Sequence, residues 1–166
     1  LEVDHLGVGT DDEVARRALG DAQREVDILH AVEEQRVEAL GGDDIDHQVA
    51  ESALQEAKMQ AVTPQDKRAV LVAARSVKEK LSTDGSAHLS VMLSGGMLSV
   101  VMTRERLAEL AKPLIDQSLA SVKRVLRDAK VKPDEVKGVV MVGGSTRMPA
   151  VRDAVGLFFG QAPLTD

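Results

Sequence analysis

The 166-residue chain has no cysteine, tryptophan or tyrosine, and two phenylalanines are its only aromatic residues. Without cysteine it can have no disulfide, no thiolate nucleophile and no cysteine-ligated metal centre or cluster. So few rings leave almost no surface on which nucleobases could stack. The net charge of −6 also argues against a nucleic-acid polymer, whose binding requires a basic face. We therefore expect no nucleic-acid partner, whereas a mononucleotide needs only a few well-placed donors and cations.

Long hydrophobic runs are absent as well. No window approaches the roughly 18 uncharged apolar residues that a membrane-spanning helix needs. The N-terminus has no basic region followed by an apolar core, which is the pattern of a signal peptide. We therefore expect no membrane partner and a cytoplasmic location, which the absence of cysteine also favours. The composition, 43% apolar and 29% charged, is typical of a folded globular protein.

The most informative stretch is residues 139–149, Val-Val-Met-Val-Gly-Gly-Ser-Thr-Arg-Met-Pro. Its four apolar residues predict a strand, its two glycines a tight turn, and Pro149 the first residue of a helix. Gly143 and Gly144 can take positive φ and let a ligand approach the backbone, and a following helix N-terminus favours an anion. The pattern indicates a phosphate site. The alternative is a plain strand-to-helix turn, because Gly-Gly is a common way to build one.

Together with residues 158–164, this stretch resembles the adenosine-and-phosphate segment of the DnaK-type, or seventy-kilodalton heat-shock, chaperones. Within that family it is most similar to the HscA-type branch, which serves iron–sulfur cluster assembly. The resemblance implies an α/β fold, namely an actin-like ATPase lobe in which helices cover a sheet, with a smaller α+β upper subdomain. It assigns residues 18–42 and 113–166 to the lower subdomain and residues 43–112 to the upper one. Residues 1–17 stay unassigned.

The resemblance also implies ligands and partners. The ligand would be ATP or ADP, with magnesium in the complete domain. The partners would be the first ATPase lobe, a nucleotide-exchange factor and a J-type co-chaperone. The turn after the strand would hold the phosphates and the adenine edge, an upstream helix would hold the nucleoside, and no catalytic residue or metal ligand is assigned. The residues carried over are Gly143, Gly144, Ser145, Arg147 and Met148 in the turn, Arg75, Lys78 and Ser82 in the helix, and Gly20.

Two regions depart from the family pattern. Residues 18–23 stand in place of a glycine-rich phosphate loop, and Asp21 would repel a phosphate there. Arg75 and Glu79 differ from the commonest pattern, which has an acid at the first position and an arginine at the second. The altered loop predicts weak or absent nucleotide binding, and the missing lobe predicts no ATP hydrolysis by this chain alone. The alternative function is a non-catalytic module that binds an exchange factor or co-chaperone, and an exposed lobe face would favour self-association.

The first half of the chain has two ambiguous segments. Residues 26–40 predict a β-hairpin, with a helix as the alternative because apolar residues there are also helically spaced. Asp44 or Asp46 is expected to cap the next helix, which carries Ile45 and Val49 on its apolar side. A metal site is the competing interpretation of these acids and His47, but their spacing matches no known ligand loop.

The second half gives clearer elements. Thr63 should cap a helix running to about Leu81, and the alternative role for Lys78 is a solvated charge on that helix. Alternating apolar residues around a Gly-Gly turn predict a hairpin over residues 87–102, with His88 on its exposed face. A helix over residues 103–129 should kink or restart at Pro113. A buried strand and a final helix ending at Gly160, with one side in the core, complete the expected sheet covered by helices.

Overall fold

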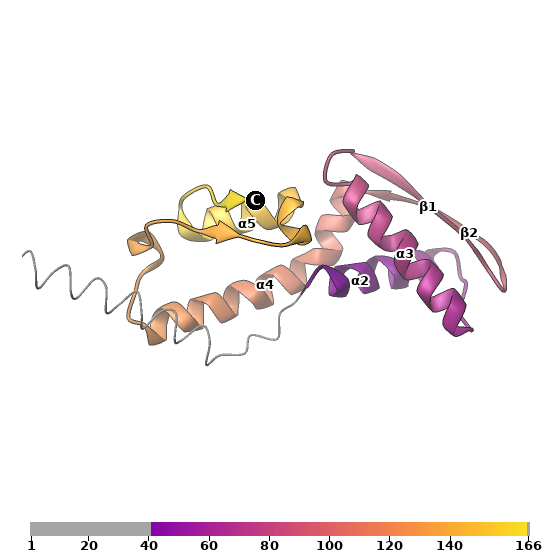
Figure 1. Cartoon of the computed structure of the whole chain (residues 1–166), viewed down its shortest axis with the longest axis horizontal. Helices are drawn as coiled ribbons and strands as arrows, with labels where there is room; N and C mark the ends of the chain where they lie inside the picture. Colours follow the sequence, from indigo (N-terminus) through magenta and orange to yellow (C-terminus); the bar gives the residue numbers. More distant parts are fainter. Residues whose placement is uncertain (1–40, 166) are drawn as a thin grey trace, which may run out of the picture.

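The structure is a computed structural model that describes residues 41–165. In Figure 1, helices α2 and α3 and the β1–β2 hairpin lie at one end, α5 lies at the other with β3 and β4, and α4 joins the two ends. The elements in chain order are α2 (Gly42–Glu56), α3 (Pro64–Lys80), β1 (Ser86–Leu93), β2 (Gly96–Thr103), α4 (Arg104–Asp128), β3 (Val140–Met141), α5 (Pro149–Phe159) and β4 (Leu164–Thr165), with 3-10 turns at Pro133–Glu135 and Gly144–Arg147.

Three of the expected features belong to residues before position 41, which the structure does not describe. The hairpin or helix of residues 26–40, the altered loop of residues 18–23 and Gly20 all lie outside the described residues. Between residues 41 and 165, no helix combines the length and the apolar character that crossing a bilayer demands.

The start of helix α2 is held by hydrogen bonds between Gly41 and Asp44. The Gly41 N–H donates to Asp44 Oδ2 at 2.8 Å, so Asp44 supports the helix start from the first turn, but the N-cap residue is Gly41 and not Asp44 as expected. The expectation that Asp46 could serve as the cap was wrong. It lies in the second turn and is 5% exposed, because α3 supplies it with a cation.

Helix α3 is fixed at its start by Asp66. Thr63 Oγ1 accepts from the Asp66 N–H at 3.0 Å, and Asp66 Oδ2 accepts from the Thr63 N–H at 3.1 Å, which confirms the predicted helix start. Asp66 also accepts hydrogen bonds from the Ser94 hydroxyl and, at 2.8 Å, from the Ser94 N–H. A single carboxylate therefore joins the first turn of α3 to the turn of the β1–β2 hairpin.

This carboxylate should make stability depend on pH. Hydrogen bonds from the Ser94 hydroxyl and N–H, and then from Thr63, hold the pKa of Asp66 below its ordinary value. A depressed folded-state pKa stabilises the fold above the unfolded pKa, near 4, and that stabilisation is lost as the pH falls through the folded pKa. We expect Asp66→Asn to lower the urea midpoint of unfolding near pH 7, and the deficit relative to wild type to shrink below about pH 4. Asp134→Asn, at an exposed acid, is the control, and a deficit independent of pH would contradict the assignment.

The hairpin confirms the alternation predicted for residues 87–102. Its strands pair antiparallel with Leu93 opposite Gly96, so Ser94 and Gly95 form a two-residue turn. Leu89 faces inward, whereas His88 is exposed as expected.

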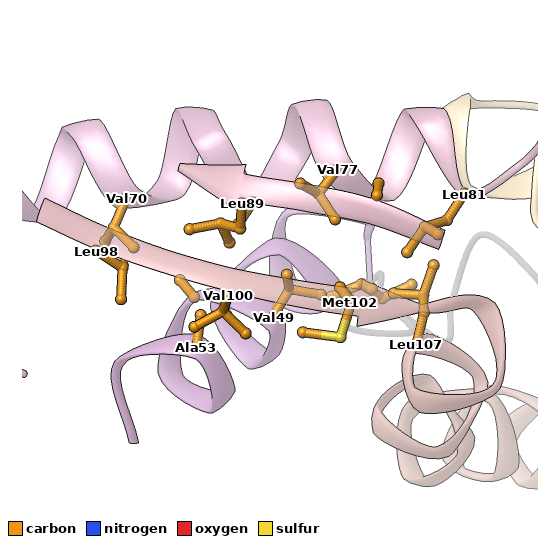
Figure 2. Packing of buried hydrophobic residues seen from close by; sticks show 14 of the residues in the cluster. Val49, Ala53, Val70, Val77, Leu81, Leu89, Leu98, Val100, Met102 and Leu107 are labelled. Carbon is orange, nitrogen blue, oxygen red and sulfur yellow. The ribbon is translucent and has the colours of Figure 1, made fainter. Parts of the chain in front are cut away.

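The hydrophobic core lies mainly between this hairpin, α2 and α3, as Figure 2 shows. Among its largest side chains, Leu81, Leu89 and Leu98 are fully buried. Val70 and Val77 come from α3, and Val49 and Ala53 come from α2. The inward-facing sides of the two helices and the hairpin therefore share one core.

Helix α4 is one uninterrupted helix, with Pro113 inside it. The expected restart at Pro113 is therefore not seen, and the other expectation, a kink within a continuous helix, stays a prediction. Proline removes one backbone donor and crowds the preceding turn at a cost of about 3 kcal/mol. Tertiary burial on both sides of the proline offsets this cost, because Leu107 and Ala111 precede it and Val125 and Leu126 follow it as buried residues.

The strand after α4 differs most from expectation. Strand β3 has two residues and pairs in parallel with β4 alone among the described residues, and Val140 is 69% exposed. Val140 is therefore exposed rather than buried as expected, since within residues 41–165 only β4 pairs with this strand, whereas Met141 is buried. The other strands expected for the sheet lie outside the described residues. Helix α5 has no fully buried residue, although Gly160 ends it in a left-handed conformation as predicted.

Candidate functional site

The turn that follows β3 keeps only part of the geometry expected from its glycines, because Gly143 has positive φ and Gly144 does not. Gly143 has φ of 105°, a conformation that favours glycine, and residues 144–147 form a 3-10 turn before α5 begins at Pro149. The Thr146 N–H donates to the Gly143 carbonyl at 3.1 Å, and the buried Thr146 hydroxyl donates to the same oxygen. The proline start of the helix is confirmed. The 3-10 turn, which begins with Gly144, lies between Gly143 and the helix, so neither glycine is at the α5 N-terminus.

The front of this turn is open. Gly143, Gly144 and Arg147 are exposed, and a Cβ atom added at either glycine would meet nothing within 4 Å. The first N–H groups of such a turn have no internal acceptor. Behind the turn, Met148 is 2% exposed and belongs to the main hydrophobic core. Met148 therefore anchors the turn, while its glycines and its guanidinium stay available to a ligand.

Lys78 of α3 is buried and paired. Its Nζ lies 2.7 Å from Asp46 Oδ1 and donates to the Gly42 carbonyl oxygen at 2.7 Å. The two side chains are 8% and 6% exposed. The alternative role as a solvated surface charge was therefore wrong, since a lysine is almost never this buried unless it is paired. Lys78 fastens the C-terminal half of α3 to the first turns of α2.

Gly42 brings the lysine and the glycine turn together. A Cβ atom built on Gly42 would lie 2.9 Å from Lys78 Nζ and 3.6 Å from Ser145 Oγ. The start of α2, the buried ammonium of α3 and the hydroxyl of the turn after β3 therefore meet at one point. Ser145 also lines a small apolar cavity of about 90 Å³, which extends between α2, α4 and α5 past Ile45 and Leu114.

Replacing Gly42 with alanine should disturb this meeting point. The new methyl would overlap Lys78 Nζ, and moving that atom would break two contacts of 2.7 Å. We expect a loss of about 1–3 kcal/mol in the free energy of unfolding, the usual cost of overpacking. Urea unfolding measures it, with Gly138→Ala as control because open space surrounds that position. Equal stability of the two variants would show that Lys78 is free to move.

Other residues expected in the site are not joined to the turn. Arg75 is 64% exposed and pairs with Glu79 at 3.3 Å on the surface of α3. Ser82 is half-buried, and its hydroxyl donates to the Lys78 carbonyl at 3.5 Å. No hydrogen bond or ion pair within residues 41–165 connects either of them to residues 143–148.

Two members of the site were missed by sequence reasoning. No sequence pattern singles out Gly42, and the acids at the start of α2 predict Asp46 only as a possible helix cap. A signal for Asp46 exists, because it recurs with Val49, Ala50 and Ala53 at the helical spacing of the buried side. Its partner Lys78 is 32 residues away, and nothing local in the sequence links the two.

The arrangement can hold an anion. The backbone of Gly143 and Gly144 and the side chain of Arg147 are exposed, and the Ser145 hydroxyl and the Lys78 ammonium both lie near Gly42. Guanidinium groups and free backbone N–H groups are the usual partners of phosphate. The carboxylate in this network, Asp46, is already paired with Lys78. The described residues therefore supply binding groups rather than a free general base.

Comparison with known proteins gives a consistent result. A family model described as Hsp70 protein matches residues 29–166. The chain is similar to proteins named Chaperone protein HscA homolog, with 59% identity over 128 residues in Methylibium petroleiphilum, 47% in Variovorax paradoxus and 48% in an Acidovorax species. Each match covers 77% of this chain and 21% of the relative, so the chain spans about a fifth of the length of these proteins.

Proposed function

Because this chain belongs to the Hsp70 protein family, we propose that it forms part of the ATP- or ADP-binding site of an HscA-type molecular chaperone. The observation that supports the proposal is the position of Gly42, which has the Lys78 ammonium and the Ser145 hydroxyl as its neighbours. A lysine and a glycine turn far apart in the sequence thereby meet beside an open anion-binding surface.

The residues would divide the nucleotide between them. Gly143, Gly144 and Ser145 would donate to phosphate oxygens, and Arg147 would lie against the phosphates and the adenine edge. Lys78 would hold the nucleoside, with Ser82 in the turn that follows α3. Met148 positions the turn through its burial, and Arg75, which is exposed and paired with Glu79, contributes from the rim. Magnesium, bound with the nucleotide, would neutralise phosphate charge.

The complete protein would use this site to drive chaperone work. A first ATPase lobe would close over the nucleotide, and ATP binding and hydrolysis would switch the affinity for client proteins. We propose a cytoplasmic setting and a role in iron–sulfur cluster assembly, on the strength of the HscA-type relatives. Residues 41–165 leave the phosphates open to solvent on one side, so this chain alone should not hydrolyse ATP.

Calorimetric titration with magnesium ADP tests the proposal. We expect weak, saturable binding that Arg147→Ala weakens further, because the guanidinium is lost from an otherwise intact turn. Arg152→Ala is the matched control, since Arg152 is an exposed arginine on α5. Saturable binding that both variants lower equally would place the nucleotide elsewhere. Absence of saturation with folded protein would overturn the proposal for this chain.

A second candidate function is a protein-interaction module without nucleotide binding. It is favoured by the core, whose buried members apart from Met148 all lie between Ile45 and Ala111. We therefore propose residues 43–112 as an upper subdomain with its own core, and the remaining described residues as part of the lower subdomain. Tight binding of an exchange factor or J-type co-chaperone, together with no response to ADP, would decide for this function.

A further inference from the structure

A groove of about 800 Å³ lies between α3 and β1. Its α3 wall includes Arg68, Ala69, Val72 and Ala73, and its β1 wall is Ser90 and Val91. Val72 is 65% exposed, so a large apolar side chain on this wall is left uncovered. The groove shares no lining residue with the candidate nucleotide site.

One wall of the groove is a free sheet edge. Because the hairpin closes with Leu93 opposite Gly96, residues 87, 89, 91 and 93 direct their backbone groups toward β2. The N–H and C=O groups of His88, Ser90 and Met92 therefore point outward. The sheet has two strands, β1 and β2, so no strand of the described chain pairs with this edge.

The edge also lacks the features that normally block pairing. Natural edge strands carry charged residues, proline or bulges against association with another strand. Residues 86–103 contain no aspartate, glutamate, lysine, arginine or proline. The groove lining has one charged side chain, the Arg68 guanidinium, and no acid. Arg68 has no ion-pair partner among the described residues, so the groove has an unbalanced positive charge beside apolar surface.

We propose that β1 and α3 form a docking groove for an extended, acidic peptide segment of a protein partner, which adds as a strand to the β1 edge. Its backbone would pair with the outward groups of His88, Ser90 and Met92. Alternate apolar side chains would cover Val72, and an aspartate or glutamate would pair with Arg68. The inference rests on the second candidate function, for which it names the surface and the chemistry of the partner.

Selection from random eight-residue peptides, the length of β1, tests the proposal on the whole chain. Recovered peptides should alternate apolar and polar residues and carry at least one acid. When the recovered peptides are synthesised, their affinity for the Arg68→Glu variant should be about tenfold or more lower than for wild type, because the glutamate would then face the acid of the peptide. Lys123→Glu makes the same charge change on the exposed side of α4 and should leave affinity within about twofold. Amide exchange at Ser90 and Met92 should slow when peptide binds.

The outcomes separate this inference from the functions above. Peptides that bind both variants equally, or that protect amides outside β1, would overturn the groove while leaving an interaction module in place. If the selection recovers no peptide, the proposal of a docking groove is wrong. If the chain also binds neither an exchange factor nor a J-type co-chaperone, the second candidate function is wrong as well. Protection of the β1 amides by concentrated chain alone would assign the edge to a second copy. The ADP titration is independent of every one of these results.

Discussion

Lys78→Met should lower the free energy of unfolding by about 3–5 kcal/mol, because it leaves the Asp46 carboxylate buried without its cation. Both side chains are less than a tenth exposed, and their charged atoms lie 2.7 Å apart. The Gly42 carbonyl would lose its donor as well. Urea unfolding measures the change, and Lys80→Met, at an exposed lysine of the same helix, should change it by about 0.5 kcal/mol or less.

A double variant separates stability from binding. Asp46→Leu combined with Lys78→Met removes both charges, and we expect it to recover most of the lost stability, since apolar replacements of buried ion pairs are often neutral. If Lys78 contacts the nucleotide, the double variant should bind ADP more weakly than wild type even though its stability is recovered. Recovery of both stability and affinity would assign the ion pair a structural role only. A Lys78→Met variant as stable as Lys80→Met would contradict the buried pair itself.

Leu89→Ala should cost about 3–5 kcal/mol, the range for truncating a fully buried leucine in a core that cannot collapse around the cavity. Leu89 is 0% exposed and lies opposite the buried Val100 in the hairpin, within the core shown in Figure 2. Urea unfolding near neutral pH gives the value. Met92→Ala is the control on the outer face of the same strand, where Met92 is 64% exposed, and it should cost far less. Similar losses in the two variants would mean that the strand faces are assigned the wrong way round.

Local sequence patterns predicted most of α3 and of the β1–β2 hairpin. The Thr63-Pro64 start of α3 and the alternation of β1 and β2 depend on neighbouring residues, so the sequence contains the whole signal. The positive φ of Gly143 and the helix end at Gly160 follow from glycine itself.

Long-range contacts account for what local patterns missed. Whether Lys78 is solvated or buried depends on Asp46, which a different helix provides. The uninterrupted course of α4 through Pro113 depends on packing along its length. Four apolar residues before Gly143 predicted a buried strand, yet burial requires neighbours on both sides of β3, and within the described residues β4 alone pairs with it. Such features belong to tertiary structure and leave no periodic signal.

We propose that a nucleotide lies between residues 143–148 and the C-terminal half of α3. Photolabelling of the whole chain with 8-azido-ATP, followed by mass spectrometry of the labelled peptides, tests it most directly. We expect label on peptides containing residues 75–82 or 143–148, and we expect excess magnesium ADP to suppress it. Label that excess ADP does not suppress, or that falls on α4 or the hairpin, would contradict the claim.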